Sequence, residues 1–162
     1  MSVTPNFGFE LLAPSQEQPE VPINYNTNKL DALLESLGGG GASDATEPVY
    51  FQLACSDLVT ALTVAAGVGY LRAAHAFTLT EVRASLQTAS SSGLPTMDIK
   101  KNGVTVLSTA LSIDATEKTS KTAATPAVIS VSAIADDDEL SVDVTAAGTG
   151  AKGLIVTLIG HL

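Results

Sequence analysis

Residues 96–109 read TMDIKKNGVTVLST and contain the clearest local fold signal in the chain. Asn102 and Gly103 stand between two runs in which apolar and polar residues alternate. An Asn-Gly pair favours a two-residue type I′ turn, because both central positions of that turn need a positive φ angle. The sequence therefore predicts a β-hairpin whose turn lies at 102–103.

The alternating pattern extends from Glu47 to the C-terminus, with Ser, Thr and Asp between apolar and β-branched residues. We predict strands in these runs: 49–55, 61–66, 69–74, 75–89, 111–114, 127–134, 139–147 and 152–162. The runs 61–66 and 69–74 are expected to flank a turn at 67–69, and 75–89 to form a long strand with a bend. About eight short strands without a convincing helix are typical of an antiparallel β-sandwich, and eight strands favour a jelly roll.

The composition limits the classes of core and of partner. The chain has 162 residues, 45% hydrophobic but only 4% aromatic and without Trp, so we expect an aliphatic core. This length suits one domain of ordinary size with an appendage. The net charge of -9 opposes binding to nucleic acid or to an anionic membrane, since phosphate recognition needs a basic surface. We expect neither partner.

Residues 1–25 contain four of the seven prolines and are predicted to form an extended arm, because proline restricts its neighbours to extended geometry. A purely disordered tail would have fewer apolar residues than this arm has. The arm is therefore expected to lie on a partner surface, and the alternative is that it lies on its own domain. The residues expected to anchor it to a larger particle are Phe7, Phe9, Leu11, Leu12, Val21, Ile23 and Tyr25.

Residues 26–37 are predicted to form one short amphipathic helix that ends at Gly38. Its apolar stripe, the expected oligomerisation surface, consists of Leu30, Leu33, Leu34 and Leu37. A helix this short is marginal alone in water, so it must either dock on its own domain or bundle with copies from neighbouring subunits. The glycine-rich linker at 38–46 favours bundling, because a flexible tether suits an association element joined to an independent domain at 47–162.

The sequence has few residues with which to build a catalytic or metal site. Cys55 is the single cysteine, which excludes an intrachain disulfide, and its apolar surroundings indicate a small buried hydrophobic residue. The two histidines, His75 and His161, have no cysteine or histidine neighbours at zinc-ligand spacing. There is no GxSxG motif, and the glycine run at 38–41 lacks the Lys-Ser/Thr of a phosphate loop. We expect no enzymatic activity, cofactor or metal.

One dense carboxylate cluster leaves two interpretations open; it consists of Asp136, Asp137, Asp138 and Glu139. It offers the oxygen ligands that Ca²⁺ prefers, but it lacks the spacing of an Asp-x-Asp-x-Asp-Gly loop. The other interpretation is a solvated turn whose charges deter edge pairing. The N-terminus shows neither the basic nor the apolar region of a signal peptide, and no run is long enough for a spanning helix, so we expect a soluble protein.

Residues 4–37, TPNFGFELLAPSQEQPEVPINYNTNKLDALLESL, resemble the N-terminal module of virion proteins from tailed phages and gene transfer agents. In that module a proline-containing arm with an A-x-x-Q-x-x-x-x-V run leads into an Asn-rich, Leu-Asp-Ala-Leu helix. The matching residues are Ala13, Gln16, Val21, Asn24, Asn28, Leu30, Asp31, Ala32 and Leu33. Gln18-Pro19 stands where Gln-Lys is more usual, so a charge contact made by that lysine is not expected here.

Residues 82–109 and 124–144 look like the small β-domains of phage tail-fibre, head-fibre and decoration proteins, which are typically trimeric jelly rolls. The resemblance implies a structural virion component assembled in the host bacterial cytoplasm: a homotrimeric head fibre or decoration protein. Its arm would bind the major capsid protein or another virion protein, with the β-domain projecting. The alternative is a receptor-binding tail or spike module that recognises a host surface glycan. A glycan depolymerase is a weaker third class, opposed by the small size and low aromatic content.

Overall fold

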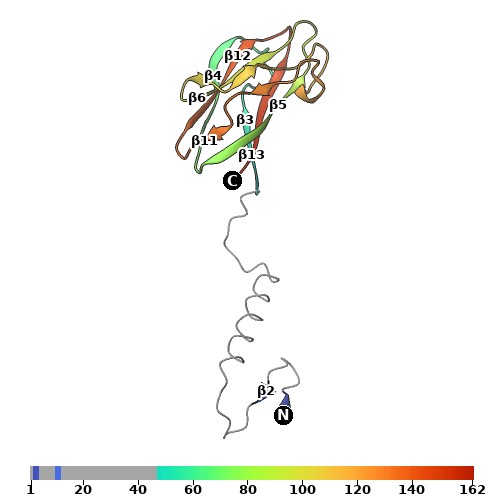
Figure 1. The fold of residues 1–162 in the computed structure, drawn as a ribbon. Coiled ribbons are helices and arrows are strands. Elements are labelled where there is room, and N and C mark those ends of the chain that lie inside the picture. The colour runs from blue at the N-terminus through green and yellow to red at the C-terminus, as the bar shows by residue number, and fades with distance from the viewer. Residues whose placement is uncertain (1, 4–9, 12–46) are drawn as a thin grey trace. The chain divides into compact units, whose positions relative to one another are not determined.

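The structure, a computed structural model, describes residues 2–3, 10–11 and 47–162 (Figure 1). The chain divides into two units, Met1–Ala42 and Ser43–Leu162. In the first unit, β1 (Ser2–Val3) pairs with β2 (Glu10–Leu11) in an antiparallel ladder. The predicted helix at 26–37, the linker at 38–46 and the rest of the arm lie outside the described residues. Residues 47–162 are called the β-domain below.

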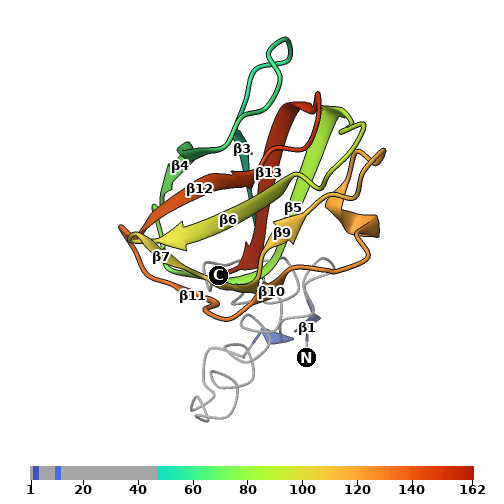
Figure 2. The same cartoon turned by 90° about the horizontal axis from the view of Figure 1, so that it is seen from above.

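The β-domain is built from antiparallel strands, most of them in two sheets (Figure 2). The first sheet consists, in spatial order, of β11 (Ala133–Ile134), β5 (Phe77–Thr88), β13 (Lys152–His161) and β3 (Pro48–Ala54). The second consists of β4 (Ala65–Arg72), β12 (Glu139–Ala146), β6 (Thr96–Lys101) and β7 (Val104–Thr105), with β9 (Leu111–Ser112) also paired to β6. The short strands β8 (Leu107–Thr109) and β10 (Val128–Ile129) pair with each other. Within the described residues the only helix is the 3-10 turn η1 (Ser120–Thr122).

The inner faces of the two sheets share one aliphatic core, as the composition predicted. Its largest fully buried side chains are Leu79, Met97, Ile99, Leu111, Ile113, Leu140, Leu154, Leu158, Val106, Val142, Val144 and Val156. Phe77 is the aromatic side chain buried in this core, and its ring lies 5.2 Å from that of the half-buried Phe51. Full burial of one large apolar side chain of this kind stabilises the folded state by about 1.5–3 kcal/mol. The prediction of a mainly β, antiparallel sandwich is confirmed.

The predicted hairpin is confirmed. β6 pairs with β7 with Lys101 opposite Val104, which leaves two residues in the turn. Asn102 and Gly103 have φ angles of 49° and 83°, the positive values that a type I′ turn requires. The Asn-Gly pair thus determines where the chain reverses between these strands.

The predicted turn at 67–69 is wrong, because β4 runs without interruption through both glycines. Gly67 has a φ of 64°, and its N–H donates to Asp143 Oδ1 at 2.7 Å. It lies where the register between β4 and β12 shifts, between Val142 and Val144. A glycine within a strand often marks such an irregularity. Residues 61–64, predicted as a strand, therefore belong to the preceding loop.

The long strand predicted at 75–89 is confirmed as β5, but its alternation changes phase along the strand. Leu79 and Val82 both lie in the core, although they are three residues apart. The register against β13 shifts between Ile159, which faces Glu81, and Gly160, which faces Leu79. β5 has one extra residue at this point. Odd-numbered side chains therefore face the core before it and even-numbered side chains after it.

The β-domain has eleven strands, β3 to β13, rather than about eight. The run 127–134 was predicted as one strand but is divided into β10 and β11, which pair with β8 and β5 respectively. The chain leaves one partner strand and joins another within a few residues. Alternation of residue type alone does not show such a change of partner.

Candidate functional site

The two chain ends of the β-domain lie together, and we call this end the base. The Leu162 N–H donates to the Glu47 carbonyl at 3.1 Å, and His161 lies opposite Pro48 in the ladder of β13 and β3. The segment that precedes the β-domain in the chain therefore joins it at the base.

Three loops meet at the opposite end, which we call the tip: 55–64, 89–95 and 147–151. The Leu62 N–H donates to the Ala151 carbonyl at 2.7 Å, and Ser91 N–H donates to the Thr149 carbonyl at 2.9 Å. The ten residues of β13 run from the tip to the base, a distance of about 33 Å at ~3.3 Å per residue. The tip is thus the end of the β-domain opposite Glu47, its first residue.

The loop between β3 and β4 stands out from the strands at the tip (Figure 2). Asp57 shapes it, because its Oδ1 accepts hydrogen bonds from the N–H groups of Val59 at 2.7 Å and Thr60 at 2.6 Å. These backbone bonds lower the pKa of Asp57 and keep the carboxylate charged. The Asp57 carbonyl also accepts from the Gly153 N–H at 3.0 Å, which ties the loop to the start of β13.

This loop exposes aliphatic side chains, and we call residues 57–64 the apolar loop. The side chains of Leu58, Val59 and Val64 are 61%, 80% and 65% exposed. Single exposed apolar residues are common on any protein, but a group of them on one projecting loop is typical of an interaction site. The apolar loop is the first candidate contact surface.

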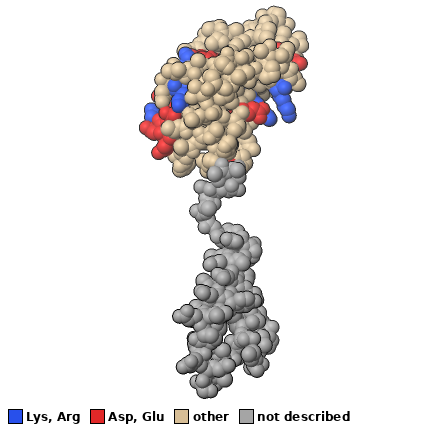
Figure 3. All heavy atoms as spheres, in the orientation of Figure 1, with Lys and Arg blue, Asp and Glu red and all other residues tan. Residues whose placement is uncertain are grey.

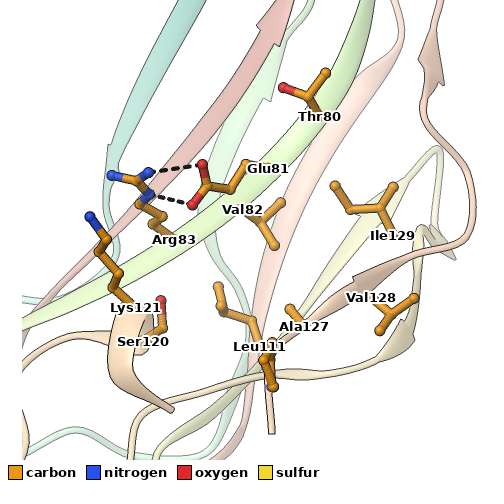
Figure 4. Close-up of a pocket in the computed structure, with 11 residues that line it drawn as sticks. Thr80, Glu81, Val82, Arg83, Leu111, Ser120, Lys121, Ala127, Val128 and Ile129 are labelled. Carbon is orange, nitrogen blue, oxygen red and sulfur yellow. Dashed lines mark hydrogen bonds and ion pairs between the residues drawn. The ribbon is translucent and has the colours of Figure 1, made fainter.

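The second candidate is a pocket of about 400 Å³ beside β5 (Figure 4). It is lined by Thr80, Glu81, Val82, Arg83, Leu111, Ser120, Lys121, Pro126, Ala127, Val128 and Ile129. Figure 4 shows the charged side chains on one side of the pocket and the aliphatic side chains on the other. None of the lining residues is aromatic, so a sugar ring would find no stacking partner within it.

The charges around the pocket leave its rim positive. Arg83 Nε and Nη2 donate to Glu81 Oε1 and Oε2 at 2.5 and 2.9 Å, and this hydrogen-bonded pair lowers the pKa of Glu81. Lys121 lies beside them in Figure 4, and among the described residues it has no carboxylate within 4.0 Å. A ligand that carries a negative charge would therefore be attracted to this side of the pocket.

The acidic cluster at 136–139 forms part of the turn before β12, and its side chains bind neighbouring groups. Asp138 accepts from the Asn102 side-chain amide at 2.6 Å and from the Ala135 N–H at 2.7 Å, and these bonds lower its pKa. Arg72 pairs with Asp137 at 3.2 Å and with Glu139 at 3.6 Å. In the part of the chain that the structure describes, no three His, Cys, Asp or Glu side chains are arranged to hold a metal ion.

Cys55 is buried at the end of β3, as its apolar surroundings predicted, and burial raises the pKa of its thiol to about 11. The raised pKa keeps the thiol protonated, and only the thiolate is a nucleophile, so this environment opposes reactivity of Cys55. His75 is exposed in the turn before β5, whereas His161 is half-buried at the end of β13. The two histidines stand on different segments, and neither is near a metal-holding cluster among the residues described.

Nearly all of the predicted contact residues lie outside the described residues. Leu11 is the exception and lies in β2, opposite Ser2. The others are Phe7, Phe9, Leu12, Val21, Ile23, Tyr25, Leu30, Leu33, Leu34 and Leu37. The apolar loop and the pocket were not predicted. A turn at 57–60 could have been predicted from Asp57, because Asp favours local turns.

Figure 3 shows that the charged side chains on the face in view gather in a few groups, with wide uncharged areas between them.

Comparison with protein-family models and with curated protein sequences found no match to this chain. Among the described residues, none belongs to a helix long and apolar enough to cross a bilayer.

Proposed function

We propose that this protein is a non-enzymatic structural component of a phage virion, a homotrimeric head fibre or decoration protein. The observation that carries the proposal is that the two ends of the β-domain differ. The preceding segment joins at the base, where Glu47 bonds Leu162, while the loops with exposed aliphatic residues lie at the tip. A projection that is anchored through its N-terminal segment and presents its far end outward has this arrangement.

We further propose that the β-domain is a jelly roll. The strand order supports this fold, because the chain alternates between the two sheets except from β6 to β9: β3, β5, β11 and β13 belong to one sheet, and β4, β6, β7, β9 and β12 to the other. Two Greek keys folded on each other alternate in this way. Small β-domains of head fibres and decoration proteins, which residues 82–109 and 124–144 resemble, are typically of this type.

The proposed anchor is the arm at 1–25, which would bind the major capsid protein or another virion protein. The proposed trimer forms through the leucine stripe of residues 26–37. Three such stripes would bury each other, at about 25 cal/mol per Å² of apolar surface removed from water. Several arms of one trimer would then bind the particle at once, and linked weak contacts produce lasting attachment.

The test is deletion of residues 1–25, with particle assembly in the host as the readout. The shortened chain should remain soluble and oligomeric but should be absent from purified particles, because it lacks its anchor. The amount of protein per particle is measured after gradient purification. The full-length variant Val104→Thr, altered at an exposed side chain of the hairpin, should associate like the unaltered chain. Shortened chains found on particles at the usual amount would refute the role of the arm.

A second candidate function is recognition of a host surface glycan by the β-domain. Two exposed aromatic residues favour it: Tyr50 on β3 and Tyr70 on β4 are 64% and 55% exposed. Aromatic rings that are apolar at one end and polar at the other are common in binding surfaces. Specific binding of the intact protein on a glycan array, lost in Tyr50→Ala or Tyr70→Ala, would favour this function over a passive decoration role.

A further inference from the structure

We propose that the β-domains of the homotrimer pack against one another around β3, the strand that lies nearest the trimer axis. The outer face of the first sheet of one copy contacts the edge of the sandwich formed by β3 and β4 of the next copy, which we call the flank. This inference rests on the proposed homotrimer and specifies which surfaces of its β-domains meet. The occupant of both surfaces is a second copy of this chain.

Both surfaces extend along β3, so copies that stand upright side by side can bring them together at the same height. Pro48 lies opposite His161 at the base, and Ala54 lies opposite Ile155 toward the tip. In a ring of three, each copy needs two different contact surfaces that meet at the axis. The outer face and the flank meet at β3, because β3 is the edge strand of the first sheet.

The open edge of β3 supports a covering surface. The N–H of Cys55, directly after β3, donates to a carbonyl of β13 at 2.8 Å, so the odd-numbered residues of the strand direct their backbone groups to β13. Tyr50, Gln52 and Ala54 direct theirs to the open side, where no hydrogen-bond partner reaches them among the described residues. Proteins protect such edges with charges, prolines, bulges or a covering surface. β3 has no charged residue and no bulge, and Pro48 stands only at its start.

The flank also leaves part of the apolar core accessible. Five apolar side chains of the two edge strands pack against the core but are only half-buried: Val49, Phe51, Leu53, Val68 and Leu71. The two sheets come close together here, since a Cβ on Gly69 would stand 2.7 Å from Cys55 Sγ. A narrow flank suits a copy that fills one third of a ring. A neighbouring copy would remove the half-buried side chains from water, which is the favourable term in most protein association.

The distribution of charge favours a second copy as the occupant. The chain carries a net charge of -9, so contact between copies is least opposed where both surfaces lack charge. Residues 48–71, which form β3, the apolar loop and most of β4, contain one charged residue, Asp57. On the outer face of the first sheet, Glu81 and Arg83 are paired with each other. Charged residues are likewise depleted at the centre of protein interfaces.

The outer face of the second sheet differs, which supports the choice of the first. The side chains that alternate with core residues there include the pairs Lys100–Asp143 at 2.6 Å and Arg72–Glu139 at 3.6 Å. The corresponding face of the first sheet presents Ile155, which is 37% exposed. The more charged face is suited to solvent, and the less charged face to a contact between copies.

The test is a cross-link between copies at β3 in the full-length chain. Gln52→Cys places one thiol per copy at an exposed position beside the proposed axis, so folding should be preserved. A short bis-maleimide should link two chains of each trimer and leave the third single, because each chain offers one accessible thiol. Native Cys55 is buried and has a raised thiol pKa, so it should not take part.

The matched control is Val104→Cys, whose thiol is equally exposed but lies on β7, at the edge of the second sheet away from the flank. It should remain a single-chain band under the same treatment. Adding Ile155→Asp to Gln52→Cys should abolish the cross-link, because it places an unpaired charge in the contact. Adding Thr145→Asp, on the outer face of the second sheet, should not.

Light scattering before cross-linking separates the two levels of the account. A three-chain mass in which Gln52→Cys links no better than Val104→Cys overturns the contact at β3 alone, and leaves the flank to the arm or to another protein. A cross-link that survives Ile155→Asp overturns the part assigned to the outer face. A single-chain mass overturns the homotrimer and this contact with it.

Discussion

Asp143 makes polar contacts that link strands of the second sheet. It is a buried carboxylate on β12, between β4 and β6. Its Oδ2 pairs with Lys100 Nζ at 2.6 Å, and its Oδ1 accepts from the Gly67 N–H at 2.7 Å. The bond to Lys100, followed by that to Gly67, lowers the pKa of Asp143. One side chain thereby joins three neighbouring strands.

We predict that Asp143→Asn lowers the free energy of unfolding by about 1–3 kcal/mol, the usual effect of breaking a buried hydrogen-bonded group. The amide cannot replace the charged bond to Lys100. Urea unfolding followed by circular dichroism measures the change. Asp136→Asn is the control, since Asp136 is an exposed carboxylate in the acidic cluster at 136–139 and its substitution should change stability little. Equal effects of both substitutions would contradict the role assigned to Asp143.

The lowered pKa of Asp143 also predicts a pH dependence. A carboxylate whose pKa is lower in the folded than in the unfolded state stabilises the folded state at pH values above its unfolded pKa of about 3.9. This stabilisation is lost as the pH falls through the folded-state pKa. The difference in stability between the unaltered chain and Asp143→Asn should therefore be full at pH 5 and shrink below pH 4. A difference that stays constant down to pH 2 would contradict this assignment.

Residue-level features that depend on tertiary register were not predictable from the sequence. Gly67 was interpreted as a turn because glycine commonly marks turns. Its partner, Asp143, lies 76 positions away in the chain, and no local pattern links the two. Cys55, by contrast, was predicted correctly as a buried residue because its neighbours in the sequence are apolar.

At the scale of the element, the hairpin of β6 and β7 has the most direct relation between sequence and structure. Its register depends on two residues with positive φ, and Gly103 has the larger angle at 83°. No neighbouring atom lies within 4 Å of the position that a Cβ would take there. Any loss of stability on substitution therefore comes from backbone conformation and not from a steric clash.

We predict that Gly103→Ala lowers the free energy of unfolding by about 1–2 kcal/mol, the range for an L-residue in left-handed geometry. Val104→Thr changes the next, exposed residue and should have an effect near zero. Thermal unfolding of both variants measures the difference. An alanine variant as stable as the unaltered chain would show that the turn does not need glycine at this position.

Runs that stay within one sheet were predicted well, and the run that divides between two sheets was not. The runs 49–55, 139–147 and 152–162 correspond to β3, β12 and β13, each of which keeps to one sheet. The run 127–134 divides between two sheets, which depends on where the rest of the chain lies. Composition and alternation thus predict elements, whereas the pairing of elements determines their limits.

For the whole molecule, the sequence predicted a mainly β sandwich with an aliphatic core but neither the apolar loop nor the pocket. The pocket is lined by segments between residues 80 and 129, and the tip is formed by three loops far apart in the chain. Such surfaces arise only after folding has brought distant segments together. The arm and the helix, on which the proposed anchoring and trimerisation depend, were inferred from local patterns and from resemblance.

The mass of the intact chain in solution tests the proposed trimer most directly. Static light scattering on the purified full-length protein should give three times the chain mass of 16.5 kDa. Leu33→Asp, which places a charge in the leucine stripe, should lower that mass. A mass of 16.5 kDa for the unaltered protein, unchanged as its concentration is raised, would contradict the account.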